Sequence, residues 1–148
     1  MKIERRFTRK DAAAYADIEF GQTSSEIRNP DGTVVFSLEN IEVPLAWTQV
    51  AADVLAQKYF RKAGIAAILK KDPEDGVPEF LWRSKPDLDA LKKLPENQRF
   101  GGETSAKHVF DRMAGAWAYW GWKGGNFTSE ADARGYFDEM RFMLAAQM

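Results

Sequence analysis

The four residues Asn29-Pro30-Asp31-Gly32 constrain the fold of this chain more than any other feature. Proline fixes φ near the value that a type I turn needs, and glycine tolerates the left-handed conformation that closes such a turn. The flanking runs, Ser25–Arg28 and Val34–Leu38, are rich in β-prone residues. The sequence therefore predicts a β-hairpin between Ile18 and Val43, with Gly32 at positive φ. A two-stranded hairpin is only marginally stable alone, so it must pack on another element.

After Pro44 the spacing of apolar residues changes from a period of two to about 3.6, which is typical of an amphipathic helix. The first long helix is expected to end before Gly64. Its predicted core-facing stripe consists of Trp47, Val50, Ala51, Val54, Leu55 and Tyr59. A short helix is expected near Asp87–Leu94, within a surface excursion over residues 65–104 that holds four of the six prolines.

Two further long helices are predicted in the last third of the chain. The second helix has a cap at Thr104 or Ser105 and ends in the glycine-rich stretch 121–125. Its apolar set is Val109, Phe110, Met113, Trp117 and Trp120. The third begins at Ser129 and keeps its apolar stripe to Met148 without a stop signal. Two explanations stay open for that end, a frayed terminal helix or a chain cut from something longer.

The predicted fold is therefore mainly α. It is a single helical domain over residues 18–148, with three main helices, a short one and an N-terminal β-hairpin, preceded by a basic arm over residues 1–17. At 148 residues the chain is long enough to bury a core without metals or disulfides.

Composition excludes several classes of function. The net charge of −1 provides no field that would attract nucleic acid or an anionic membrane. The chain has no cysteine, which excludes thiolate metal sites and thiol chemistry by this chain itself. The single histidine, His108, has no second ligand and is expected on the surface. No apolar run of signal or membrane length is present, so the expected location is the cytoplasm. We expect no metal, no cofactor-binding and no catalytic residue in this chain.

Two clusters mix aromatic and cationic side chains and are candidate interfaces. The first consists of Trp117, Tyr119, Trp120, Trp122 and Lys123. These aromatics point in more directions than one helix face can bury, so some should contact a partner or another element. The second cluster consists of Lys58, Tyr59 and Arg61 at a helix end. The alternative for the first cluster is a packing role within the domain. For the second it is a solvated last turn, where cations also favour the helix dipole.

Several long runs, taken in order, closely resemble the N-terminal domain of class II, adenosylcobalamin-dependent ribonucleotide reductases. The runs are Met1–Thr8, Ser25–Gly32 with Val34-Val35-Phe36, Leu55–Gly64, Leu81–Ser84, Gly101–Lys107 and Tyr119–Gly125. They extend over essentially the whole chain.

The resemblance implies an enzyme that reduces ribonucleotides to deoxyribonucleotides for DNA synthesis, through a cysteine thiyl radical generated from adenosylcobalamin. In that family the chemistry takes place in an α/β barrel that follows this domain. This chain departs from the family because it ends where the barrel should begin, and none of the family's catalytic residues maps onto it. The resemblance therefore implies an accessory module that packs against a catalytic barrel, in the same chain or a separate subunit, and is not catalytic alone.

One alternative from another class is a free-standing protein-binding module that uses the aromatic cluster around Trp117–Trp122. An exposed apolar patch of that kind could also produce a homo-oligomer. In either case the sequence predicts a protein partner, with nucleotides reached only through the parent enzyme.

Overall fold

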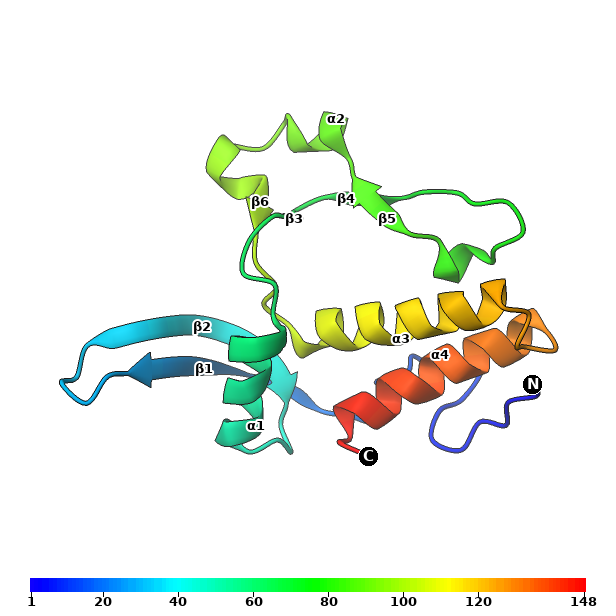
Figure 1. The fold of residues 1–148 in the computed structure, drawn as a ribbon, viewed down its shortest axis with the longest axis horizontal. Helices are drawn as coiled ribbons and strands as arrows, with labels where there is room; N and C mark the ends of the chain where they lie inside the picture. Colours follow the sequence, from blue (N-terminus) through cyan, green and yellow to red (C-terminus); the bar gives the residue numbers. More distant parts are fainter.

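A computed structural model describes all 148 residues of the chain. Two long helices, α3 (Ala106–Lys123) and α4 (Glu130–Ala145), lie side by side and form the body of the molecule (Figure 1). The hairpin projects from one end of this body, and residues 65–104 form an arch over α3 (Figure 1). The first residues run beneath α4, and the last residue lies beside the first helix.

The hairpin is confirmed at its predicted place in the chain. Strands β1 (Phe20–Arg28) and β2 (Val34–Pro44) pair antiparallel, with Ile27 opposite Phe36 near the turn. Gly32 has φ +87°, and its N–H donates to the Asn29 carbonyl at 2.9 Å. The turn therefore forms as predicted, because its conformation depends only on the neighbouring residues Asn29–Gly32.

The first helix forms where predicted but faces the core with different residues. It consists of α1 (Gln49–Val54) and a π-helical turn, η1 (Leu55–Tyr59). Ala52, Leu55 and Ala56 are buried, whereas Val50, Val54 and Tyr59 of the predicted stripe are exposed. The helix has apolar residues on more than one side, and the hairpin and α3 cover the side that carries the alanines. The predicted core stripe was therefore wrong for half of its members.

Local caps define both ends of the body helices. The Ser105 hydroxyl accepts from the Lys107 N–H, and the Ser129 hydroxyl accepts from the Asp132 N–H. Helix α3 ends at Lys123, within the glycine-rich stretch where its end was predicted. Helix α4 ends at Ala145 with Gln147 at φ +57°, so its predicted continuation to Met148 was wrong. The reversal uses a left-handed residue where glycine is usual.

The arch contains short strands that the sequence did not predict. Strand β3 (Ile65–Ala66) pairs with β6 (Phe100–Gly101), and β4 (Leu69–Lys71) pairs with β5 (Ser84–Pro86). Single turns separate them: η2 (Glu79–Leu81), α2 (Leu88–Leu91) and η3 (Glu96–Gln98). The predicted helix near Asp87–Leu94 is thus reduced to one turn.

The fold class is mixed α/β, because helices hold 37% and strands 21% of the chain. The prediction of a mainly α fold was wrong. Strands of two or three residues are too short to show an alternating apolar pattern. Their presence in residues 65–104 could therefore not be predicted from the sequence. None of the helices has both the length and the apolarity that crossing a membrane requires.

Two apolar cores stabilise the fold. The first lies between the hairpin, α1 and the first half of α3, around Ile41, Val109 and Phe110. The second lies beneath the arch, where Val77 and Leu81 pack on the second half of α3 and on α4. The arch is therefore attached to the body through residues 77–82, and its distal part lies away from both cores (Figure 1).

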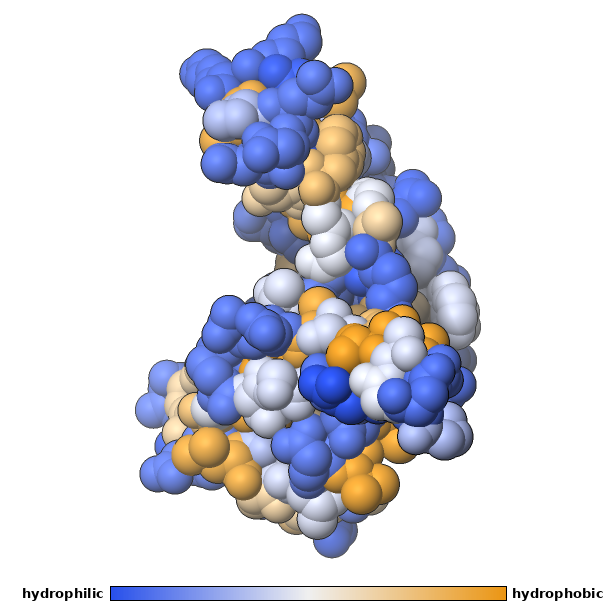
Figure 2. Space-filling view, turned by 90° about the vertical axis from the view of Figure 1, so that its left-hand side faces the viewer, coloured by the Kyte–Doolittle hydropathy of each residue, from blue (hydrophilic) through white to orange (hydrophobic).

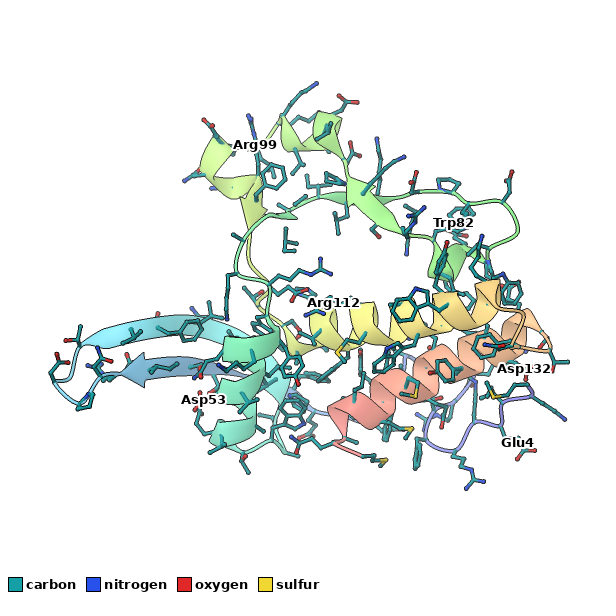
Figure 3. The ribbon with its side chains drawn as sticks, in the orientation of Figure 1. Glu4, Asp53, Trp82, Arg99, Arg112 and Asp132 are labelled. Atoms are coloured by element: carbon teal, nitrogen blue, oxygen red, sulfur yellow. The ribbon has the colours of Figure 1, made fainter.

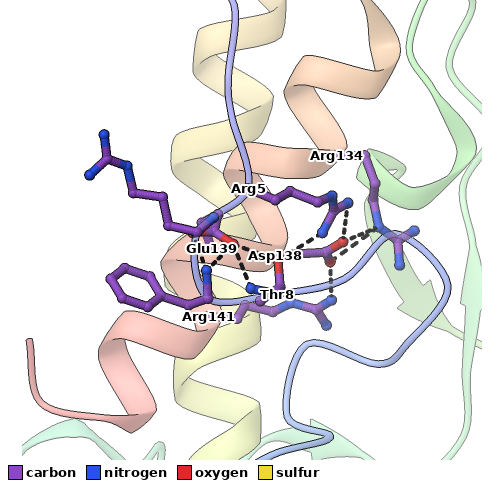
Figure 4. A network of polar contacts seen from close by, with 8 residues as sticks. Arg5, Thr8, Arg134, Asp138, Glu139 and Arg141 are labelled. Atoms are coloured by element: carbon purple, nitrogen blue, oxygen red, sulfur yellow. Dashed lines mark hydrogen bonds and ion pairs between the residues drawn. The ribbon is translucent and has the colours of Figure 1, made fainter.

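The N-terminal arm lies along α4 and is held there by two buried carboxylates (Figure 4). Asp138 accepts from Arg5 at 2.7 Å, from Arg141 at 2.6 Å and from Arg134 at 3.2 Å. Burial alone would raise the pKa of Asp138, but these cations outweigh it and hold the pKa below its usual value. Two basic residues of the arm, Arg5 and Arg9, thus pair with acidic residues of the same chain, Asp138 and Asp17.

Candidate interaction surfaces

Three of the predicted interface residues on α3 contact the arch. The Tyr119 hydroxyl donates to Glu74 at 2.9 Å, and the Lys123 ammonium lies 2.8 Å from the same carboxylate. The Trp122 indole N–H donates to the Gly76 carbonyl at 2.7 Å. Hydrogen bonds from Lys123 and Tyr119 lower the pKa of Glu74. These side chains attach the arch to α3, which corresponds to the packing alternative.

The remaining aromatics of this cluster lie on a different side of α3. Trp120 is 65% exposed, and Trp117 is half-buried. Trp120, and not Trp122, is therefore the most exposed aromatic residue of the cluster. An exposed tryptophan of this size is a frequent anchor of protein interfaces. Trp120 is the residue of this cluster best placed to contact a partner.

The cluster of Lys58, Tyr59 and Arg61 lies near the start of α3. The Tyr59 carbonyl accepts from the Arg112 guanidinium, and the Arg61 N–H donates to Glu103 at 2.9 Å. Arg112 precedes Trp120 by about 12 Å along the helix axis, since each residue rises ~1.5 Å. The two predicted clusters therefore belong to different parts of the surface and do not form one site.

A shallow apolar groove, which the sequence analysis missed, lies beside the second cluster. Its volume is about 350 Å³. The lining residues are Trp47, Thr48, Val50, Ala51, Val54, Leu55, Tyr59 and Gln147. The signal was present in the sequence, because α1 carries more apolar residues than one core-facing side can hold. The labelled side chains in Figure 3 place Asp53 of α1 well away from Trp82 of the arch.

The surface toward the hairpin end mixes apolar and polar patches (Figure 2). Apolar side chains gather there in separate groups, and the molecule is hollowed between the arch and the body. Leu69, Leu88 and Phe100 of the arch are each more than half exposed. The arch therefore also has apolar side chains without a partner.

Metal-ligating side chains do not cluster on these surfaces. No three His, Asp or Glu side chains gather as a metal-binding group would require. His108 is exposed on α3, as predicted. Gly102 lies against the Lys62 carbonyl, which would be 2.8 Å from an added Cβ. That glycine permits a close approach of two backbone segments.

Comparison with known proteins assigns the chain. A family model described as class II vitamin B12-dependent ribonucleotide reductase matches residues 21–147. This chain belongs to that family, as its N-terminal domain. It is 64% identical over all 148 residues to a vitamin B12-dependent ribonucleotide reductase of Bradyrhizobium diazoefficiens. It is 60% identical over 147 residues to that of Agrobacterium fabrum. The chain spans 12% of the length of each relative.

The two hollows of this reductase domain differ in the chemistry of their linings. The only histidine is exposed, and the groove beside α1 is lined by apolar side chains with Thr48 and Gln147 as its polar members. A second hollow, of about 370 Å³, lies at the hairpin between residues 22–24 and 39–40 and has no aromatic or aliphatic lining.

Proposed function

We propose that the chain is an accessory domain of an adenosylcobalamin-dependent ribonucleotide reductase. In this proposal the parent enzyme converts ribonucleotides to deoxyribonucleotides in the cytoplasm, and the catalytic barrel holds the cobalamin and the radical cysteine. The domain packs against that barrel and contributes no reacting group. Its lack of cysteine supports this division, because a thiyl radical cannot form on it.

The observation that carries the proposal is the combination of high identity with small coverage. The match to the two relatives covers 148 and 147 residues of this chain at 64% and 60% identity, yet it covers only 12% of each relative. A domain with this share of a larger enzyme has neighbours to pack on. Inter-domain contacts of this kind typically bury about 600–1,500 Å².

The exposed apolar residues supply surface for such a contact. Trp120 is 65% exposed, and Leu45 and Val50 are 60% and 71% exposed on another side of the molecule. Tryptophan at the centre of an interface commonly contributes more than 1 kcal/mol, roughly 2 kcal/mol or more at the strongest positions. Trp120 is therefore the residue that we expect to matter most in barrel packing.

A reconstitution experiment tests the proposal. The 148-residue chain is mixed with parent reductase that lacks these residues, and association is followed by sedimentation velocity. We expect a complex that Trp120→Asp weakens and that Leu88→Asp, an equally exposed control on the arch, leaves unchanged. Absence of association at concentrations of about 100 μM, which would mean a dissociation free energy below roughly 5.5 kcal/mol, would contradict the proposal.

A further inference from the structure

Helix α1 carries apolar side chains on the side that faces away from the core. Val50 is 71% exposed, and Val54 and Tyr59 are each 49% exposed. Ala52, Leu55 and Ala56 already supply the side that packs on the hairpin and α3. A helix at the surface of a single domain usually has charged or polar residues on its outer side. The apolar residues on the outer side of α1 are therefore typical of a surface that another protein segment covers.

The groove along this side of α1 is suited to apolar protein side chains. It is shallow, its volume of about 350 Å³ is near the lower end of ligand pockets, and six of its eight lining residues are hydrophobic. The lining contains no cation that could hold a phosphate, and its side-chain hydrogen-bonding groups, apart from the Trp47 N–H that already binds Ala145, are those of Thr48, Tyr59 and Gln147. A nucleotide would therefore lack the polar contacts that orient such a ligand.

The last residues of the domain are fixed at the rim of this groove. The Trp47 indole N–H donates to the Ala145 carbonyl at 2.8 Å, which joins the start of α1 to the last turn of α4. Gln147 then turns in the left-handed conformation at φ +57° and lines the groove itself. The Met148 N–H donates to the Met143 carbonyl at 3.0 Å, which closes the helix end.

We propose that the groove beside α1 binds the polypeptide segment that directly follows this domain in the parent reductase. The inference rests on the proposed function, because it requires the relatives' longer chain. The segment would place two or more apolar side chains against Val50, Val54 and Tyr59. Since its first residue is attached at the groove rim, its effective concentration there is in the ~mM range or above, so weak apolar contacts suffice.

A second copy of the chain fits the groove less well. Stable dimer interfaces need about 800 Å² and about 20–30 residues from each partner. The groove has eight lining residues. A tethered segment needs no such area, because the cost of association is largely met by the covalent connection.

Photo-crosslinking in the full-length parent reductase tests this inference. Val54→p-benzoylphenylalanine places the probe in the groove, and Val35→p-benzoylphenylalanine, at the hairpin and 61% exposed, is the matched control. We expect the probe at position 54 to crosslink to residues of the same chain within roughly the first 50 residues that follow the domain. The probe at position 35 should give no crosslink to that segment.

Other crosslinking results would overturn the inference. Crosslinks from position 54 to the distant barrel alone would exclude the following segment while leaving the proposed function intact. Crosslinks between two chains would assign the groove to a dimer. Absence of crosslinks from position 54 would mean an open groove.

A charge substitution gives an independent readout. Val50→Asp should leave the fold intact because this side chain is 71% exposed. In the full-length enzyme it should release the following segment and raise its rate of proteolytic cleavage by about fivefold or more. Val35→Asp should leave that rate unchanged. An unchanged cleavage rate in Val50→Asp would count against the inference.

Discussion

The Thr8 hydroxyl donates a hydrogen bond to Glu139 Oε1 at 2.6 Å, joining residues that lie 131 positions apart in the sequence. The backbone N–H groups of Arg6, Phe7 and Thr8 donate to the same carboxylate at 2.8–3.2 Å. Glu139 is 8% exposed, so these donors have little access to water as an alternative. One buried carboxylate thus attaches the N-terminal arm to α4 (Figure 4).

Replacement of this carboxylate should therefore destabilise the domain. Glu139→Gln substitutes an amide, whose NH₂ group cannot accept from the backbone donors of the arm. We expect a loss of about 2–3 kcal/mol in the free energy of unfolding, measured with urea. Glu4→Gln, an exposed carboxylate on the same arm, should change it by less than about 0.5 kcal/mol. Equal effects of the two substitutions would show that the arm is not held by Glu139.

Acid should weaken the same contact. Burial alone would raise the pKa of Glu139, but the hydrogen bonds from Thr8 and the backbone outweigh it and hold the pKa below its ordinary value of 4.5. A carboxylate with a lowered folded-state pKa contributes stability above its unfolded pKa and loses it as pH falls through the folded pKa. Urea midpoints should therefore be steady near neutral pH and decline below about pH 4.5.

The variant provides the control for this pH dependence. Glu139→Gln has no proton to gain at this position, so its stability should decline less steeply in acid than that of the natural chain. Part of the decline will remain, because the pKa of the neighbouring Asp138 is also held low by Arg5 and Arg141. Parallel acid curves for the two proteins would contradict the assignment to Glu139.

The hairpin turn gives a test of backbone conformation without side-chain contacts. An added Cβ at Gly32 meets no atom within 4 Å, so the effect of Gly32→Ala comes from φ +87° alone. We expect a loss of about 1–2 kcal/mol in unfolding free energy. Gly101→Ala also meets no atom, and its φ is not positive, so that variant should be neutral or stabilised by up to ~1 kcal/mol. A neutral Gly32→Ala would argue against the left-handed turn residue.

The features predicted correctly from sequence depend on neighbouring residues. The hairpin follows from Pro30 and Gly32, and the starts of α3 and α4 follow from the Ser105 and Ser129 caps. Each signal lies within a few residues of the structure that it specifies. These elements formed at the predicted places for that reason.

The features that sequence did not predict depend on distant contacts. Trp122 binds the carbonyl of Gly76, 46 residues away, and no local pattern indicates that pairing. Likewise, α1 has apolar residues on two sides, and the sequence does not show which side faces the core. Only the positions of the hairpin and α3 select Ala52 and Leu55 and leave Val50 exposed.

The proposed division of labour predicts that the domain is inert by itself. The purified chain, incubated with ribonucleotides, adenosylcobalamin and a dithiol, should form no deoxyribonucleotide above a control without protein. The physical reason is that a chain without cysteine cannot carry a thiyl radical or a reducing dithiol pair. Product formation that depends on the chain would refute the assignment of the chemistry to the barrel.

The most direct test of the central claim, that this domain packs on the rest of a reductase, is hydroxyl-radical footprinting of Trp120. The oxidation rate of this residue, 65% exposed here, is compared between the 148-residue chain and the full-length parent enzyme. Leu88, 61% exposed on the arch, is the reference. We predict that oxidation of Trp120 falls about threefold or more in the full-length enzyme while Leu88 is unchanged, since interface cores exclude water. An equal rate for Trp120 in both proteins would contradict the account.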